Sequence, residues 1–327
     1  MLLYEKDKKT NAAFACLYEA GVMALEKTDL HKRIESGKPI LIAELSPPKG
    51  ADPAPVRAAA KSFAGKIHAL GVSDNRDGVH MSAIAAATLI LSEGVEPIMH
   101  VTTRDRNRIA LVSDCLGAQA MGIRNLLCTT GTHQTLGSCR KARNVFDIDS
   151  IHLLGMYGGL ADDGSLVGEE RFADAGPFCL GSTASPCADP LEMQVIRLAK
   201  AVAAGSKFII TQPVFDVDRF VAWWDEVTRR GLHEKVAIIA GIQPLPDAEI
   251  ARAYADRRPN PMIPEAVLQR ISEPGDKSGQ RAAGIEIALE TLQRLSSLKG
   301  LRGFEVRGDG NAGIAVEVIE RSGLGIN

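Results

Sequence analysis

Residues 39–73 read PILIAELSPPKGADPAPVRAAAKSFAGKIHALGVS and contain the repeating unit that decides the fold. An apolar run at 39–45 precedes a stretch in which Asp52 and Pro53 supply the start of a helix and Gly65 supplies its end. A second apolar run follows at 67–73. This order of strand, helix and strand predicts two parallel strands that lie side by side, joined by a helix.

The same unit recurs through the rest of the chain. Amphipathic segments separate further apolar runs at 96–102, 123–129, 177–183, 207–212, 235–241 and 301–306. One of these segments begins at Asp189 and Pro190, which we expect to act as N-cap and first helical residue, and ends at Gly205. Eight strands that each lead into a helix predict an α/β protein with a closed (β/α)8 TIM barrel. An open doubly wound sheet is the weaker alternative, because no G-x-G-x-x-G turn follows the first run.

Two stretches exceed a minimal barrel. Residues 1–38 form an N-terminal helical arm in which 12–25 reads as a helix, and residues 259–298 add extra helices before the last strand. The predicted organisation is therefore the arm, 1–38, and a single barrel catalytic domain, 39–327. We interpret the arm as a helix that covers the bottom of the barrel, and a docking surface for a partner protein is the alternative.

Composition excludes several classes of protein. The 327 residues are 45% apolar and 24% charged, which suits a globular protein with a large core. With a formal net charge of −2, the chain lacks the excess of positive charge that binds nucleic-acid phosphates. No stretch approaches the roughly 18 apolar residues of a membrane span, and Glu19 interrupts the run at 11–25 that resembles a signal peptide. The six cysteines lack zinc-site spacing, so we expect reduced thiols in a cytoplasmic protein.

Polar residues at the ends of the apolar runs predict where the site lies. In a (β/α)8 barrel the C-terminal ends of all strands meet on one face, which carries the active site. Glu44 stands near the end of the first run, before Pro47 and Pro48, where burial would raise its pKa toward the range of a general acid. An equally weighted alternative is a buried ion pair with Arg307. His100 is either a ligand contact or, more commonly for a lone strand histidine, a satisfied core residue.

Gln212, the loop at 129–133 and two neighbouring tryptophans can each be interpreted as functional or as purely structural. The amide of Gln212 can recognise a heterocyclic edge with one donor and one acceptor. The loop TTGTH at 129–133 suits close approach of a cofactor, and an ordinary strand-to-helix turn is its alternative. The helix face with Trp223 and Trp224 is a candidate interface of a homo-oligomer, although we expect one of the two in the core.

Several blocks in a fixed order give the chain a specific resemblance to one family. They are AELSPPKG at 43–50, GVSDN at 71–75, MHVTTRDRNR at 99–108, GIRNLLCTTGTH at 122–133, AGSKFIITQPVFD at 204–216 and AGIQP at 240–244. From about residue 30 to the end, the chain resembles methylenetetrahydrofolate reductase, a flavin-dependent (β/α)8 barrel.

The resemblance implies a role for each matching residue. Glu44 would be the general acid that opens the five-membered ring of 5,10-methylenetetrahydrofolate, and reduced FAD would deliver hydride from N5 to the exocyclic carbon. Gln212 would bind the pterin, with Gln243 and Arg307 also on the substrate side. Ser73 replaces a family threonine near the flavin ring. The other positions that match cofactor contacts are His100, Thr130, Gly131, Thr132, Ser182, Thr183, Ser185, Arg197 and Lys200.

Three positions depart from the family pattern. Thr132 stands where the family generally has aspartate, Ser185 where tyrosine or asparagine is commoner, and Glu305 where histidine is frequent. Loss of a carboxylate beside the flavin should favour the anionic reduced flavin and raise its potential. We therefore expect a flavin adapted to another electron donor or to oxidation of methyltetrahydrofolate. The candidate replacements for the missing carboxylate are Asp74, Asp147 and Asp309.

Three functions remain open at this point. The leading hypothesis is an FAD enzyme that interconverts 5,10-methylenetetrahydrofolate and 5-methyltetrahydrofolate, with NADH or NADPH as candidate electron donor. The second is a folate-reducing subunit of a larger electron-transfer complex, whose residues 1–38 dock the partner protein. The third is a barrel that binds flavin or folate without catalysis.

Overall fold

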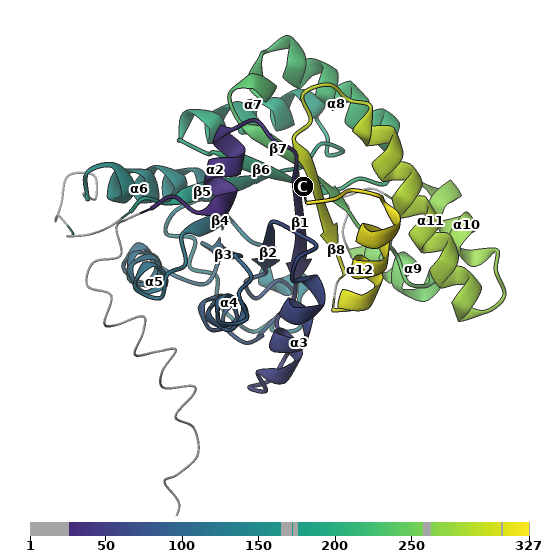
Figure 1. Cartoon of the computed structure of the whole chain (residues 1–327), viewed down its shortest axis with the longest axis horizontal. Coiled ribbons are helices and arrows are strands. Elements are labelled where there is room, and N and C mark those ends of the chain that lie inside the picture. The colour runs from purple at the N-terminus through teal and green to yellow at the C-terminus, as the bar shows by residue number, and fades with distance from the viewer. Residues whose placement is uncertain (1–25, 165–171, 173–175, 258–262, 309, 327) are drawn as a thin grey trace, which may run out of the picture.

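A closed barrel of eight parallel strands, β1 to β8 in chain order, forms the centre of the molecule (Figure 1). The computed structural model describes residues 26–164, 172, 176–257, 263–308 and 310–326. The strands are β1 (Ile40–Leu45), β2 (Ala69–Val72), β3 (Pro97–Thr102), β4 (Asn125–Thr129), β5 (Cys179–Ala184), β6 (Phe208–Pro213), β7 (Ala237–Ile242) and β8 (Gly303–Arg307). The barrel closes where β8 pairs with β1, which places Arg307 opposite Glu44. The predicted (β/α)8 barrel and its eight strands are confirmed.

Helices surround the barrel on the outer side of the strands, except α2, which lies at the N-terminal end (Figure 1). They are α2 (Asp29–Glu35), α3 (Ala54–Phe63), α4 (Ala83–Ser92), α5 (Arg108–Ala120), α6 (Ser150–Asp163), α7 (Leu191–Ala203), α8 (Val217–Arg229), α9 (Ala248–Arg257), α10 (Glu265–Ser272), α11 (Lys277–Ser296) and α12 (Ala312–Arg321), with short 3-10 turns η1 (Gln134–Leu136) and η2 (Leu232–Glu234). The predicted extra helices before the last strand are confirmed as α10 and α11. Among the helices that the structure describes, none is long and apolar enough to cross a membrane.

The two predicted helix starts have different outcomes. At α3 the N-cap is Pro53, one residue later than predicted, but Asp52 Oδ1 does accept a hydrogen bond of 2.9 Å from the amide of Ala54, and Gly65 adopts a left-handed φ of 73° just beyond the helix. At α7 the N-cap is Pro190, with no side-chain hydrogen bond. The prediction that Asp189 caps α7 is wrong, because this carboxylate instead accepts a 2.5 Å hydrogen bond from Arg219 of α8.

Strand alternation explains what fills the barrel. Side chains of one parity point inward, and those of the lower layers form one apolar cluster. Its members are Leu30, Ile40, Ile42, Ala69, Ile98, Leu127, Cys179, Phe208, Ile210, Ala237 and Ile239. The same parity continues along β1, β3 and β8 to Glu44, His100 and Glu305. A layer of titratable side chains therefore lies directly above an apolar floor.

The N-terminal end of the barrel is covered by α2 (Figure 1). Leu30 is fully buried in the apolar cluster, and the Glu96 carboxylate accepts 3.0 Å hydrogen bonds from the amides of Asp29 and Leu30. Thr28 caps this helix through its side-chain oxygen. We did not predict α2, although Thr28 is a recognisable cap. The predicted helix at 12–25 lies outside the described residues, and the division at residue 38 stays a prediction.

Trp223 and Trp224 of α8 are both in the core. Their exposed fractions are 0% and 3%, since Phe220 stacks on Trp224 and His233 of η2 contacts it edge-on. The prediction that this face is an exposed candidate interface is therefore wrong. The short η2 turn, which follows α8, closes the side of the helix that would otherwise have been exposed.

Candidate active site

A cavity of about 700 Å³ opens at the C-terminal ends of the strands. It brings together nearly all of the predicted site residues, namely Glu44, Ser73, His100, Thr130, Gly131, Thr132, Ser182, Thr183, Ser185, Arg197, Lys200, Gln212 and Arg307. Gln243 is buried outside the lining, and its Oε1 has no hydrogen-bond partner among the described residues. The lining also contains Arg76 and Arg104, which sequence reasoning missed because both lie in loops beyond the ends of the apolar runs.

Glu44 is the most constrained carboxylate of the cavity. Arg76 donates a short hydrogen bond to Oε1, and Arg307 Nε lies 3.5 Å from Oε2. Burial raises the pKa of Glu44, but the guanidinium groups of Arg76 and Arg307 outweigh burial and lower the pKa to about 2. The prediction that the pKa of Glu44 rises is therefore wrong. The predicted ion pair with Arg307 is present, and the same side chain also lines the cavity.

Glu305 carries the raised pKa that we expected at Glu44. Its side chain is fully buried and accepts a 2.5 Å hydrogen bond from Arg307 Nε. Burial raises the pKa of Glu305 to about 7, and the negative charge of Glu44 adds to this, while Arg307 opposes it. On the neighbouring strands β1 and β8, the pKa of Glu44 is therefore lower, and that of Glu305 higher, than the ordinary pKa of a glutamate.

His100 faces the same carboxyls from β3. Burial lowers its pKa to about 4, so the imidazole is neutral at neutral pH. Its Nε2 has no hydrogen-bond partner among the described residues, which differs from the satisfied core histidine of the plain interpretation. Gly71 makes room for this nitrogen, because a Cβ at that position would lie 3.2 Å from Nε2.

None of the described candidate replacements supplies a free carboxylate near Thr132. Asp74 accepts hydrogen bonds from Arg106 and from the amide of Thr102. Asp147 is paired with Arg108 and lies outside the cavity lining, and Asp309 is outside the described residues. The Thr132 carbonyl accepts a 2.7 Å hydrogen bond from Arg104 Nη1. The loop therefore lies against a guanidinium group.

The other side of the cavity is rich in hydroxyl groups and ends at two cations. Thr130 donates to Ser150 Oγ at 3.2 Å, and Ser182, Thr183 and Ser185 line the adjoining wall. Arg197 and Lys200 of α7 are exposed, and neither makes an ion pair with any residue that the structure describes. Hydroxyls, backbone amides and unpaired cations are the groups that bind phosphate esters in proteins.

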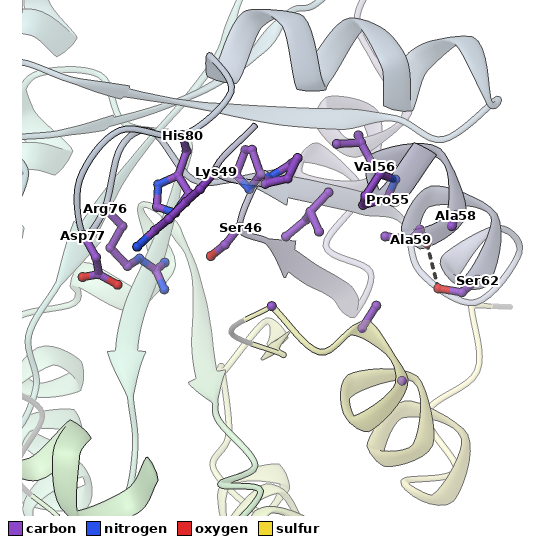
Figure 2. A pocket seen from close by; sticks show the side chains of 16 residues that line it. Ser46, Lys49, Pro55, Val56, Ala58, Ala59, Ser62, Arg76, Asp77 and His80 are labelled. Carbon is purple, nitrogen blue, oxygen red and sulfur yellow. Dashed lines mark hydrogen bonds between the residues drawn. The ribbon is translucent and has the colours of Figure 1, made fainter. Parts of the chain in front are cut away.

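A second cavity of about 570 Å³ adjoins the first at Arg76, which lines both. Figure 2 shows Lys49, Arg76, Asp77 and His80 at one end of this second cavity. Apolar side chains of α3, including Val56, lie at the other end. The guanidinium that holds Glu44 is therefore accessible from two sides.

The closed (β/α)8 barrel with a large polar cavity at the C-terminal strand ends has the architecture of barrel enzymes, whose active sites lie on that face. The sequence profile of methylenetetrahydrofolate reductase matches residues 29–308. The chain therefore belongs to the methylenetetrahydrofolate reductase family, as its sequence blocks indicate.

Two curated relatives and one solved structure are similar to the chain. Methylenetetrahydrofolate reductase 1 of Schizosaccharomyces pombe is 31% identical over 36% of this chain and 20% of its own length. Methylenetetrahydrofolate reductase 2 of Saccharomyces cerevisiae is 27% identical over 66% of this chain and 34% of its own. The chain thus spans about a third or less of these relatives. An uncharacterized Clostridium thermocellum protein that binds two copies of 5-methyl-5,6,7,8-tetrahydrofolic acid shares the fold, with 13% identity, TM-score 0.60, and coverage of 89% of this chain and 98% of its own.

Proposed function

We propose that this chain interconverts 5,10-methylenetetrahydrofolate and 5-methyltetrahydrofolate as a flavin-dependent oxidoreductase. One observation carries the proposal. A single cavity combines a buried carboxylate, Glu44, an amide at a strand end, Gln212, and two cations that form no ion pair within the described part of the chain, Arg197 and Lys200. A carboxylate and an amide suit a folate ring, whereas hydroxyls and cations suit a phosphate-bearing cofactor. Membership of the methylenetetrahydrofolate reductase family supports this assignment.

The residues present fit FAD. The cavity of about 700 Å³ falls in the range of small-molecule sites, roughly 300–1,000 Å³, and part of its wall consists of hydroxyl side chains. Thr130, Ser182 and Ser185 would hold the polar parts of the cofactor, and Arg197 with Lys200 would hold its pyrophosphate. When bound, FAD supplies hydride transfer at N5, which no side chain can perform. NADH or NADPH is the proposed electron donor.

The protein residues would handle the proton and the orientation of the folate. Glu44 would donate a proton to the ring nitrogen whose bond to the bridging carbon breaks, and would take the proton back in the opposite direction. Gln212 would hold the pterin edge with its amide. Arg307 would fix the position of Glu44, since the two side chains are opposite each other across β1 and β8.

An anaerobic titration of the purified, flavin-loaded protein tests this function. The flavin absorbance near 450 nm is recorded while 5-methyltetrahydrofolate, and in a separate cell NADH, is added. We expect bleaching by both reagents. Bleaching by methyltetrahydrofolate alone would assign the folate half-reaction to this chain and make a partner protein the source of electrons. Flavin that neither reagent bleaches, or a chain that binds no flavin, would contradict the proposal.

Thr132→Asp is expected to lower the reduction potential of the bound flavin. A carboxylate at this position would oppose the anionic reduced form, with a shift on the order of 30 mV for each 1.4 kcal/mol of charge interaction. Thr132→Asn is the matched control, since it has the shape of aspartate without the charge. The potential is measured with reference dyes under anaerobic conditions. Equal potentials in the aspartate and asparagine variants would show that residue 132 does not face the flavin.

A further inference from the structure

Three titratable groups meet in the upper layer of the barrel interior. They are Glu44 from β1, His100 from β3 and Glu305 from β8. One carboxylate oxygen of each glutamate and one imidazole nitrogen all lie within 4.8 Å of one another. Their exposed fractions are 4%, 6% and 0%. Among the described residues, Glu44 Oε2, His100 Nε2 and Glu305 Oε1 have no hydrogen-bond partner. Buried polar atoms normally have partners, so this cluster needs an explanation.

A proton suits this cluster better than a metal ion. Two carboxylates and an imidazole could ligate a divalent cation, but Arg76 and Arg307 already neutralise the two carboxylates. A dication would therefore add two charges to a neutral, buried site, whose desolvation cost is high. A single proton adds far less charge, and it can move among the three unpartnered atoms once a small approach of the side chains brings two of them within hydrogen-bond distance. The charged and titratable groups that face Glu305 are Glu44 (β1), Arg76 (after β2), His100 (β3) and Arg307 (β8).

We propose that Glu305 stores the proton that Glu44 delivers to the folate, and that His100 Nε2 passes it between the two carboxyls. This inference rests on the proposed function. Glu305 acts through Glu44 and is thus a positioning residue, whereas Glu44 is the catalytic one. The two roles need two different carboxyls. A carboxyl with a low pKa is a strong acid but holds no proton at neutral pH, so a second carboxyl must hold one nearby.

The step balances in both directions. The lone pair of the ring nitrogen takes the proton of Glu44, and the electron pair of the broken carbon–nitrogen bond stays on that nitrogen. This proton has reached Glu44 from Glu305 through His100 Nε2, because the Glu44 carboxyl holds none of its own at neutral pH. Glu305 is left as a carboxylate beside Arg307, 2.5 Å away, and takes a proton from solvent at the end of the cycle. Oxidation of methyltetrahydrofolate runs the same transfers backward.

Glu305→Gln tests the stored proton in the full-length, flavin-loaded chain. In the wild type, ¹³C NMR of labelled glutamate carboxyls should show one carboxyl that titrates near pH 7, which follows from the raised pKa of Glu305. The variant should lose that titration. The single-turnover rate at which 5,10-methylenetetrahydrofolate reoxidises the reduced flavin should change with pH around 7 in the wild type, because ring opening needs the proton first, and the variant should lose this dependence and react at least about tenfold slower.

Two further variants keep the test specific. Glu305→His should retain a pH-dependent rate, with the inflection moved to lower pH because an imidazolium beside Arg307 is disfavoured. Glu96→Gln is the matched control, since Glu96 is a carboxyl with a raised pKa at the opposite end of the barrel. It should leave the pH profile unchanged.

The outcomes separate this proposal from the proposed function. A wild type that shows the titration near pH 7 but no folate-dependent bleaching would overturn the proposed function, and proton delivery with it. A wild type that turns over while Glu305→Gln keeps the same pH profile would overturn the role of Glu305 alone. A stoichiometric metal ion in the purified protein that Glu305→Gln removes would replace the proton with a metal.

Discussion

Replacing Glu44 with glutamine is expected to slow the folate half-reaction roughly 10²- to 10⁴-fold, the usual contribution of a general acid. Glutamine keeps the size and the hydrogen-bonding oxygen of Glu44 but cannot donate the proton. Flavin should still bind, because its proposed contacts are elsewhere, at Thr130 in the loop after β4 and at Arg197 and Lys200 in α7. The measurement is the anaerobic rate at which 5,10-methylenetetrahydrofolate reoxidises the reduced flavin, together with the flavin content. Undiminished turnover with bound flavin would remove Glu44 from the mechanism.

The same substitution also changes the buried charge balance. Without the Glu44 carboxylate, Arg76 and Arg307 lose a partner, and removal of one member of a buried ion pair destabilises by about 3–5 kcal/mol. Glu44→Asp is therefore the companion variant, since it keeps the charge and the fold while moving the carboxyl away from the substrate. We expect its rate to lie between those of the wild type and the glutamine variant.

Gly284→Ala is expected to destabilise the protein by about 3 kcal/mol or more, the upper range for overpacking a tight site. Gly284 lies within α11, and an added Cβ would overlap the carbonyl oxygen of Leu245. A backbone oxygen cannot move aside as a flexible side chain can, so either α11 or the loop after β7 must shift. That loop begins at Gln243, so the shift would reach the site. Urea unfolding followed by circular dichroism measures the loss.

Gly155→Ala is the control for this effect. Gly155 is also helical, in α6, but a Cβ there would meet no atom within 4 Å. The substitution should therefore stabilise by about 0.5–1 kcal/mol, because alanine loses less conformational entropy than glycine in a helix. If both alanine variants shift the unfolding midpoint by the same amount in the same direction, the close approach of Leu245 to α11 is not a structural constraint.

The fold could be predicted because its signals are local. Each strand is an apolar run bounded by polar or glycine residues, and the prediction at 39–45 differs by one residue from Ile40–Leu45. Errors arose where a distant element competed for a side chain. Aspartate is a common N-cap residue, but the Asp189 carboxylate accepts a hydrogen bond from Arg219 of the next helix instead of capping α7. Trp224 would be exposed on an isolated helix, but η2 covers it.

The position of the site followed from topology, but its electrostatics did not. Barrel geometry alone brings Glu44 and Arg307 together, since closure pairs β1 with β8. The sign of the pKa shift at Glu44 depends on Arg76, a loop residue with no periodic signal. Sequence reasoning counted burial and omitted this guanidinium, and so assigned the raised pKa to Glu44 when Glu305 carries it. The pKa of each buried carboxyl depends on all the charged groups around it, so omitting one guanidinium changed the prediction.

The apolar floor of the barrel restricts solvent access to the charged layer to the upper end of the barrel. Below Glu44 and Glu305, side chains such as Ile42, Ile210 and Ile239 are fully buried and contain no atom that could relay a proton. The end beyond them is closed by Leu30 of α2. Exchange with bulk water must therefore pass through the upper end, either by the large cavity that the ligand would fill or by the second cavity at Arg76. A bound ligand would block the larger of these routes, so a deuterium label placed in the cluster before binding should exchange with solvent more slowly in the complex than in the free protein.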